Sequence, residues 1–286
     1  MKSLQQHSLR RAFSRIGAEV RFRVPRWGRS GFSLDIERLH RKEIFVIFAT
    51  NEVDFTVVSV EPGIRHLLLM VKDPAIKEVA HSKFLCGHDE RHYFMAAIPE
   101  RAGATSVRTA MTALKPKEVL NVETAAGIKP RYLHSRRRRL KNGERIFRQG
   151  EFMFVPRLDF KPASPLGIVR DEILTRERMR ANFWGSSNRG NPHIAREAYR
   201  QTGTMVFVTH QYPGGLTKKE RFELFQQDPA ARRLYWWTQQ RDPDVYVRGT
   251  IRHPEHATID LGRIWHSVYV NTEGQSHAGR HLSFID

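Results

Sequence analysis

Residues 43–71 read EIFVIFATNEVDFTVVSVEPGIRHLLLMV and decide the fold class expected for the N-terminal half. The segment holds three runs of β-branched, aromatic and aliphatic residues, Ile44 to Phe48, Phe55 to Val60 and His66 to Val71. Runs of this length, bounded by polar residues or by a Pro-Gly pair, are typical of strands. The segment therefore predicts three successive strands of one antiparallel sheet.

Two short helices are expected beside these strands. Ser33 is a candidate N-cap for a helix through His40. Thr105 or Ser106 is a candidate N-cap for a helix through Leu114. Hydroxyl side chains suit this position because their oxygen accepts a hydrogen bond from an otherwise unpaired amide in the first helical turn.

The C-terminal half is rich in predicted strands. Residues 147–156 predict a strand, with Gly150 as the site of a bulge. Thr217 and Glu220 have the spacing of a capping box at the start of a helical stretch. Three successive strands of a meander are expected at residues 244–252, 257–261 and 264–271.

These elements predict an α+β fold: an N-terminal antiparallel sheet with helices, a basic connector, and a C-terminal β-rich domain ending in a three-stranded meander. Residues 127–144 mark the boundary because they combine glycine, proline and a charge run with almost no apolar periodicity. The expected parts are a basic N-terminal segment at 1–42, an α+β domain at 43–126, the connector at 127–144, and a β-rich domain with a helical insertion at 145–286.

The charge balance favours a polyanionic partner. The 286-residue chain has 48 Lys and Arg against 30 Asp and Glu, a formal net charge of +18. Nucleic acid, either RNA or DNA, is the leading interpretation, and an acidic protein partner is the alternative. A single cysteine excludes an internal disulfide and fits a reducing compartment, so the expected location is cytoplasmic. No apolar run approaches the ~18 residues of a transmembrane helix.

The positive charge is densest at residues 129–148, KPRYLHSRRRRLKNGERIFR. Guanidinium groups in a flexible loop can follow a phosphate backbone and release its counterions, which gives affinity without sequence choice. A nearby tyrosine ring can stack on an exposed base. The alternative is a solvated linker. The candidate nucleic-acid-binding residues are Arg131, Tyr132, Arg136, Arg137, Arg138, Arg139, Lys141 and Arg148.

The turn RHPEH at residues 252–256 is the strongest candidate for site chemistry. On a straight strand, His253 and His256 would point to opposite faces of the sheet. Pro254 instead favours a type I turn, whose end residues have Cα atoms within about 7 Å. Both imidazoles could then bind one zinc or other divalent ion, with Glu255 as an oxygen ligand or proton-transfer group. The alternative is a turn whose imidazoles form only structural hydrogen bonds.

A zinc site needs at least a third protein ligand. His193 is the best candidate because it lies in a loop just before ordered structure, and His210 and His266 are weaker candidates. The expected metal ligands are therefore His193, His253 and His256.

A second cluster of potential ligands lies at residues 86–92, CGHDERH, between two short apolar runs. It offers a thiol, two imidazoles and two carboxylates, which suit a metal knuckle or a Cys-His nucleophilic pair. A polar hairpin turn between two core strands is the favoured interpretation. The chain has no Walker phosphate loop, dinucleotide GxGxxG, HExxH or GxSxG pattern, so ordinary enzyme classes receive no direct support.

Two short motifs in the C-terminal half resemble an uncharacterised bacterial family. They are Arg148-Gln149-Gly150-Glu151 before a strand, and the pattern HPEHxxIxL at residues 253–261. Members of that family open with an RQGD-type strand and close with a THEEH-like turn. The resemblance implies no reaction, but it implies that His193, His253 and His256 belong to one site. This sequence departs from the family in having one histidine where a central glycine-histidine segment usually offers two.

Three functions from different classes fit these observations. The leading interpretation is a nucleic-acid-binding accessory protein, with a mobile element as one setting. The second is a metal-dependent hydrolase or nuclease in which Glu255 is the catalytic group and the three histidines hold the ion. The third is a protein-interaction or structural component that binds an acidic partner.

Overall fold

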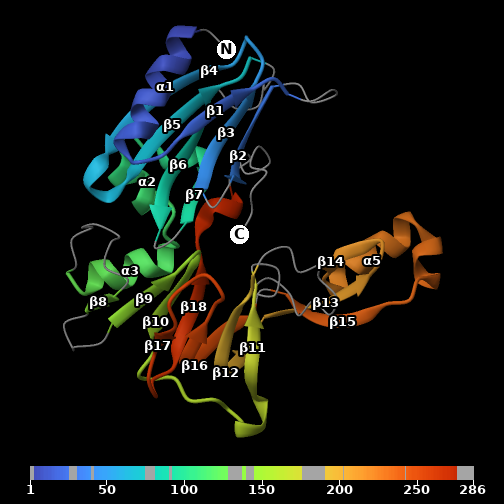
Figure 1. Cartoon of the computed structure of the whole chain (residues 1–286). Helices are drawn as coiled ribbons and strands as arrows, with labels where there is room; N and C mark the ends of the chain where they lie inside the picture. The colour runs from blue at the N-terminus through green and yellow to red at the C-terminus, as the bar shows by residue number, and fades with distance from the viewer. Residues whose placement is uncertain are drawn as a thin grey trace. The chain divides into compact units, whose positions relative to one another are not determined.

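The computed structural model describes residues 3–25, 31–39, 42–74, 81–89, 92–127, 137–139, 145–175, 191–201, 203–241 and 243–275 (Figure 1). The chain forms two compact units, residues 1–142 with 271–286, and residues 143–270. Helices and largely antiparallel sheets make up both units, so the predicted α+β class is confirmed. None of the described helices is long and apolar enough to cross a membrane.

The first unit contains two sheets. In one, the strand order is β1-β3-β2, with β1 parallel to β3 and β2 antiparallel to it. The other is fully antiparallel, in the order β4-β5-β6-β7. The strands are β1 (Val20–Arg23), β2 (Phe32–Leu39), β3 (Lys42–Ala49), β4 (Asp54–Glu61), β5 (His66–Lys72), β6 (Ser82–Asp89) and β7 (His92–Ile98). The three strands predicted within residues 43–71 are β3, β4 and β5, although β3 belongs to a different sheet from the other two.

Side-chain alternation along β5 gives its sheet an apolar surface on each face. Leu67 and Leu69 belong to a buried cluster that also contains Phe13 of α1 (Ser3–Arg15). Leu68 belongs to a second cluster with Val107 of α2 (Val107–Ala113). Successive strand residues point to opposite faces, so the sheet is covered on both sides. Apolar residues of α1 such as Leu9 and Phe13 thus belong to the core of the first unit, whereas composition predicted a separate segment at residues 1–42.

The helix predicted from Ser33 to His40 is wrong. Residues 32–39 form β2, which pairs with β3 from Phe32 opposite Ala49 to Leu39 opposite Lys42. Phe32, Leu34 and Ile36 are buried and recur every second residue, which is the period of a strand with one face in the core. This alternation outweighs the capping preference of Ser33.

The helix predicted from Thr105 or Ser106 is confirmed. The Ser106 hydroxyl accepts a hydrogen bond from the Thr109 amide at the start of α2. A second helix, α3 (Lys117–Ala125), follows after Pro116. Lys115 and Glu123 form an almost fully buried ion pair, with 2.6 Å between Nζ and Oε2.

The second unit is built on one antiparallel sheet, in which the strands run β11-β12-β16-β18-β10-β9 and β17 also pairs with β16. Phe152, Phe154 and Val247 are among its buried core residues. The three strands predicted at residues 244–252, 257–261 and 264–271 are present as β16, β17 and β18, but β16 pairs with both of the others, which is not the order of a meander. Their bounds are β9 (Arg145–Gln149), β10 (Phe152–Pro156), β11 (Ile168–Leu174), β12 (His193–Gln201), β16 (Asp244–Arg252), β17 (Ile259–Asp260) and β18 (His266–Val270).

The strand predicted at residues 147–156 is instead a tight hairpin of β9 and β10. Gln149 pairs with Phe152, so Gly150 and Glu151 form a two-residue turn. Gly150 has φ +55°, a left-handed conformation that glycine adopts without steric cost and that two-residue hairpin turns require. Gly150 is thus a turn residue and not a bulge.

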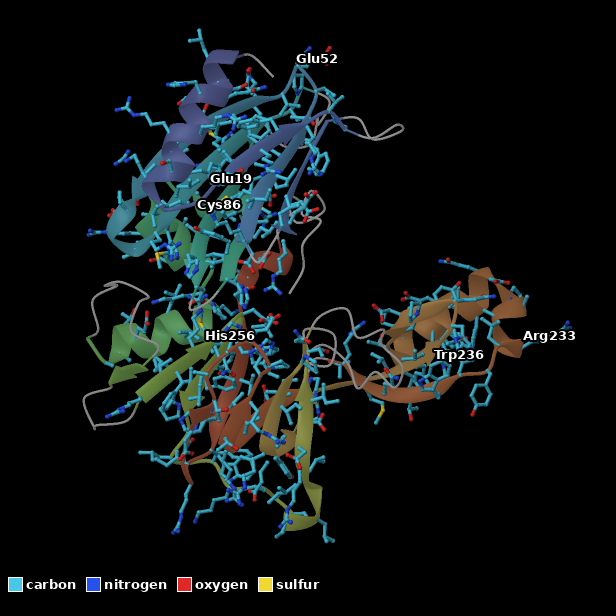
Figure 2. All side chains as sticks on the ribbon, viewed as in Figure 1. Glu19, Glu52, Cys86, Arg233, Trp236 and His256 are labelled. Carbon is cyan, nitrogen blue, oxygen red and sulfur yellow. The ribbon has the colours of Figure 1, made fainter. Side chains whose placement is uncertain are left out.

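The second unit also contains a separate three-stranded sheet, in the order β14-β13-β15, with one helix. These elements are β13 (Thr204–Thr209), β14 (Tyr212–Leu216), α5 (Lys218–Gln227) and β15 (Trp237–Arg241). The capping box predicted for α5 is confirmed, because Thr217 and Glu220 each accept a hydrogen bond from the other's backbone amide. Trp236 stacks on Tyr212 with ring centroids 5.8 Å apart. Figure 2 labels Trp236 beside this three-stranded sheet.

Candidate metal centre

Three histidines of the second unit meet at one point. His193 is the first residue of β12, and His253 and His256 lie in the loop between β16 and β17. Since β12 and β16 are neighbouring antiparallel strands, the start of β12 lies beside the end of β16, where Ile194 pairs with Arg252 (Figure 1). The sheet therefore brings together two segments that are about 60 residues apart in sequence.

The three imidazoles are close enough to share an ion. One nitrogen from each ring lies within 4.8 Å of the others. The ring centroids of His253 and His256 are 4.5 Å apart, and those of His193 and His253 are 4.4 Å apart. The sequence-based expectation that the turn brings His253 and His256 together, with His193 as the third member, matches this geometry. Figure 2 labels His256 within this unit.

Hydrogen bonds to backbone groups orient two of these rings. His253 Nε2 lies 2.8 Å from the carbonyl oxygen of Asn191, and its Nδ1 accepts a bond of 3.1 Å from the Glu255 amide. An acceptor at Nδ1 places the proton on Nε2, which therefore donates to Asn191. Metal-binding histidines usually donate their second ring nitrogen to a carbonyl or carboxylate in this manner, and this fixes the ring for the ion.

His193 is also oriented by a backbone group, but only one of its two nitrogens is hydrogen-bonded. Its side chain hydrogen-bonds the backbone of Gln149, while Nε2 is buried and has no hydrogen-bond partner within the described part of the chain. Nδ1 is therefore the nitrogen that bonds Gln149. Buried polar atoms are almost always paired in folded proteins, so this nitrogen is available to bind a ligand beside the other two imidazoles.

Electrostatics keep His193 in the form that binds metals. Burial, followed by the charges of His253 and His256, lowers the pKa of His193 to about 3, and the Gln149 hydrogen bond opposes this only in part. The ring is therefore neutral at physiological pH. Only a neutral imidazole has the lone pair that coordinates an ion.

Gly150 completes the wall of the centre. A Cβ atom at this position would lie 3.3 Å from His256 Nε2, 3.4 Å from His193 Cε1 and 3.5 Å from His193 Nε2. The neighbouring Gln149 ties the hairpin to the histidine loop, because its side-chain amide donates a 2.7 Å hydrogen bond to the Ala257 carbonyl. The absence of a side chain at Gly150 leaves space directly beside the ligand nitrogens.

The donor set fits a transition metal such as zinc. Zinc binds imidazole nitrogen at about 2.0–2.1 Å with tetrahedral geometry, so two ligand nitrogens lie about 3.3 Å apart. Starting from separations of at most 4.8 Å, small rotations of the rings close the remaining distance. Three histidine ligands leave a fourth position for water or substrate, which is the arrangement of catalytic and not of structural zinc sites.

The other residues predicted for this chemistry lie apart from the three nitrogens. Among the described residues, Glu255 is not a member of the group of potential ligands, although it is half-buried and adjacent to His256 in sequence. His266 is buried on β18 and its Nδ1 donates to the Ile264 carbonyl at 2.9 Å. His210 packs edge-on against Trp237. His193 is thus the third member, as expected.

The predicted knuckle at residues 86–92 does not form among the residues that the structure describes. Cys86 is a completely buried core residue of β6, where it pairs with Met95, and burial raises the pKa of its thiol. A buried, protonated thiol is inert as a nucleophile or ligand. A hairpin turn between two core strands was the favoured interpretation of this segment, and β6 and β7 form such a hairpin. The turn is shorter than expected, because β6 continues through Cys86 to Asp89.

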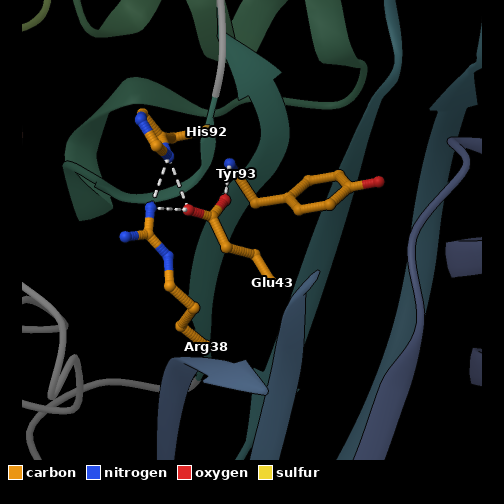
Figure 3. A network of polar contacts seen from close by, with 4 residues as sticks. All are labelled: Arg38, Glu43, His92 and Tyr93. Atoms are coloured by element: carbon orange, nitrogen blue, oxygen red, sulfur yellow. Dashed lines mark hydrogen bonds and ion pairs between the residues drawn. The ribbon is translucent and has the colours of Figure 1, made fainter. Parts of the chain in front are cut away.

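His92 instead belongs to a polar network around Glu43 (Figure 3). The carboxylate of Glu43 accepts hydrogen bonds from His92 Nδ1 at 2.5 Å, from the Tyr93 amide at 2.8 Å, and from Arg38 at 3.3 Å. Burial raises the pKa of Glu43, but these bonds and the charge of His92 outweigh it and lower the pKa overall. The network joins β3 to β7 within the first unit.

The predicted nucleic-acid-binding residues are only partly described. Arg131, Tyr132, Arg136 and Lys141 lie outside the described residues. Arg137, Arg138 and Arg139 form a short strand, β8 (Arg137–Arg139), where a flexible loop was expected. Arg148 lies on β9 and its Nε donates to the Gly150 carbonyl at 2.9 Å, so this residue supports the hairpin beside the centre.

Sequence reasoning missed the backbone partners of the centre. Gly150 was interpreted as a bulge, and neither Gln149 nor Asn191 was identified. The roles of Gln149 and Gly150 could have been inferred from the Arg148-Gln149-Gly150-Glu151 motif, because a glycine at its third position suits a left-handed turn. Comparison of the chain with protein families, curated proteins and solved structures found no match.

Proposed function

We propose that the protein is a metal-dependent hydrolase whose ion is held by His193, His253 and His256. The observation that carries the proposal is the meeting of three imidazoles from separate segments, one of which has a buried nitrogen with no hydrogen-bond partner in the described structure. His193 uses its other nitrogen for a backbone group, which leaves Nε2 for the ion. His253 donates Nε2 to Asn191, and an ion at its Nδ1 would replace the hydrogen bond from the Glu255 amide.

The chemistry of such a centre follows from its open position. A divalent ion lowers the pKa of a bound water toward ~7 and so supplies a hydroxide nucleophile at neutral pH. Glu255 neighbours His256 in the loop and is the proposed group that accepts the proton of this water. Gly150 leaves room beside the ligands for a substrate to approach.

The first test is the metal content of protein purified without a polyhistidine tag or chelators. The wild type is expected to contain about one ion per chain, and His193→Ala and His256→Ala are expected to lose it. His210→Ala is the matched control, because it removes an exposed imidazole of the same unit that lies outside the cluster. Equal metal content in all four proteins would overturn the proposal.

The second test separates catalysis from metal binding. Glu255→Gln is expected to keep the ion but to lose most of the hydrolytic activity on a labelled oligonucleotide, because an amide cannot accept the proton. A Glu255→Gln variant with metal and unchanged rate would exclude Glu255 from this role. A wild type that holds metal but cleaves nothing would leave a binding centre without the proposed reaction.

We also propose nucleic acid as the partner, in a cytoplasmic setting. The support is the net charge of +18 and the arginine-rich stretch at residues 136–139. Binding through phosphates releases counterions, so affinity is expected to fall steeply between 50 mM and 200 mM salt. Equal affinity at the two salt concentrations would contradict this proposal and leave the metal centre unaffected.

A further inference from the structure

A second polar site lies on the opposite face of the sheet that carries the histidines. A cleft of about 450 Å³ is lined by Arg170, Asp171, Arg196, Glu197, Thr250 and Arg252. These residues come from the adjacent strands β11, β12 and β16. Their strand neighbours Ala195 and Ile251 are buried in the aliphatic core, so the cleft opens on the other face. Three guanidinium groups and two carboxylates surround it.

The backbone departs from regular strand geometry on β11 and β16 at this cleft. Asp171 lies opposite Arg196, between the pairs Arg170 with Glu197 and Glu172 with Ala195. On the other side of β12, Gly249 and Thr250 together face Arg196, because the register shifts between Ala195 and Glu197. Two residues opposite one define a β-bulge, and bulges are common beside active sites, where they redirect a side chain.

Two residues at this rung adopt left-handed conformations. Gly249 has φ +79° and Asp171 has φ +50°. Glycine tolerates this region, but for aspartate it is strained, and strained backbone of this kind clusters at functional sites.

The bulge also fixes the position of Arg196. A Cβ atom on Gly249 would lie 3.1 Å from Arg196 Cδ and 3.3 Å from Arg196 Cβ. The aliphatic part of the arginine therefore lies against the bare backbone of Gly249. Contact along the side chain reduces its freedom and presents the guanidinium at the cleft.

The charges around the cleft are unevenly paired. Arg252 binds Asp171 at 2.6 Å, and Glu197 is bound at 2.5 Å by Arg248, which is outside the lining. Within the described part of the chain, Arg170 and Arg196 form no ion pair or hydrogen bond. The cleft thus has two guanidinium groups available for a ligand, with the Thr250 hydroxyl beside them.

We propose that this cleft binds a phosphate group through Arg170, Arg196 and Thr250. The planar guanidinium presents paired N–H groups that match two phosphate oxygens, and a hydroxyl can donate to a third. The inference rests on the proposed nucleic-acid partner for the source of the phosphate, either a polynucleotide backbone or a free nucleotide. Arg252 directly precedes His253, so the cleft and the metal centre flank the same end of β16.

The test measures fluorescence anisotropy of a labelled thymidylate oligonucleotide with the full-length protein, in chelator so that no metal contributes. Arg170→Ala/Arg196→Ala is expected to weaken binding at least tenfold. Two lost phosphate contacts should also make the slope of log affinity against log salt shallower by about 1.4. Arg233→Ala/Arg263→Ala is the control, because it removes the same charge from two exposed positions and should weaken binding less than threefold.

A lysine pair separates geometry from charge. Arg170→Lys/Arg196→Lys keeps both charges but loses the planar fork, so it should bind more weakly than the Arg233→Ala/Arg263→Ala control. If both alanine pairs weakened oligonucleotide binding equally, and circular dichroism showed both folds intact, the proposed phosphate site would be overturned. The proposal that the protein binds nucleic acid would stand. A wild type that binds no oligonucleotide would overturn both.

Competition identifies the source of the phosphate. If thymidine monophosphate displaces the oligonucleotide from the wild type and binds the Arg170→Ala/Arg196→Ala protein more weakly, the cleft takes a free nucleotide. If only longer oligonucleotides compete, it takes the backbone of a chain. Inorganic phosphate is the third competitor. If inorganic phosphate displaces the oligonucleotide, the cleft recognises the phosphate group alone.

Discussion

Replacing Gly150 with alanine is the sharpest perturbation of the candidate metal centre. The substitution adds one methyl group at a hairpin turn and leaves all three histidines in place. This methyl group would lie 3.3 Å from His256 Nε2 and 3.5 Å from His193 Nε2. Either the rings or the hairpin must shift by a few tenths of an ångström to accept it.

The expected effect on metal affinity follows from the tolerance of coordination bonds. Ligand distances in metal sites hold to within about 0.2 Å, so a displacement of a few tenths removes the fit. Changes that misplace a liganding imidazole typically reduce metal affinity by about 10-fold to 100-fold. Gly150→Ala is therefore expected to weaken zinc binding by this factor.

The left-handed backbone makes a control necessary. An alanine forced to φ near +55° destabilises the fold by about 1–2 kcal/mol whatever surrounds it. Gly262 has φ +72° in the same unit, and a Cβ there would meet nothing within 4 Å. Gly262→Ala should show the same loss of stability with unchanged zinc affinity.

The assay is a competition titration of chelator-treated protein with a chromophoric zinc indicator, combined with thermal unfolding. Zinc at about 100 times the dissociation constant adds about 2.7 kcal/mol of stability to a protein that binds it only when folded. This increment should appear in the wild type and in Gly262→Ala and should shrink in Gly150→Ala at the same zinc concentration. If Gly150→Ala bound zinc as tightly as Gly262→Ala, the proposed position of the ion would be refuted.

The remaining predictions concern stability. Glu123→Gln should destabilise the protein by about 3–5 kcal/mol in urea unfolding, because it leaves the buried ammonium of Lys115 without its counterion, whereas replacing both residues by Met and Leu should restore most of the loss. Thr217→Ala should cost about 1 kcal/mol and Thr217→Ser much less, since only the serine keeps a hydroxyl cap, and equal losses would contradict the capping role. Burial lowers the pKa of His266 below the usual value of 6.5, so its contribution to stability is present above pH 6.5 and declines as the pH falls below it. His266→Asn should therefore show a smaller drop between pH 7 and pH 5 than the wild type, and an identical drop would exclude His266 as a source of that dependence.

The local patterns of the sequence predicted most of the strands. Runs such as Ile44 to Phe48 and His66 to Val71 become β3 and β5, and the capping residues Ser106 and Thr217 begin the expected helices. The failures occurred where two local signals compete. At residues 32–39 the period-two burial of Phe32, Leu34 and Ile36 prevailed over the capping preference of Ser33. Pairing between distant strands has no local signature, so the separation of β3 from β4 and β5 into different sheets could not be predicted.

The candidate centre was predicted from side-chain chemistry and the geometry of a proline turn. His253 and His256 have a spacing that only a turn makes useful, and His193 lies in the segment that leads into β12. What joins them is the pairing of β12 with β16, which the sequence does not specify. The phosphate cleft could not be found in advance, because Arg170, Arg196 and Thr250 are brought together by a bulge and by the left-handed conformation of Asp171.

The burial of Cys86 makes the chain well suited to labelling experiments. It is the only cysteine in the sequence, and its side chain is 0% exposed in the first unit. Thiol reagents should therefore react with the native protein only when that unit opens, so the reaction rate reports on opening without an engineered cysteine. A cysteine introduced at exposed Arg233 should react much faster, which allows a single fluorophore to be attached to the second unit while Cys86 remains unmodified.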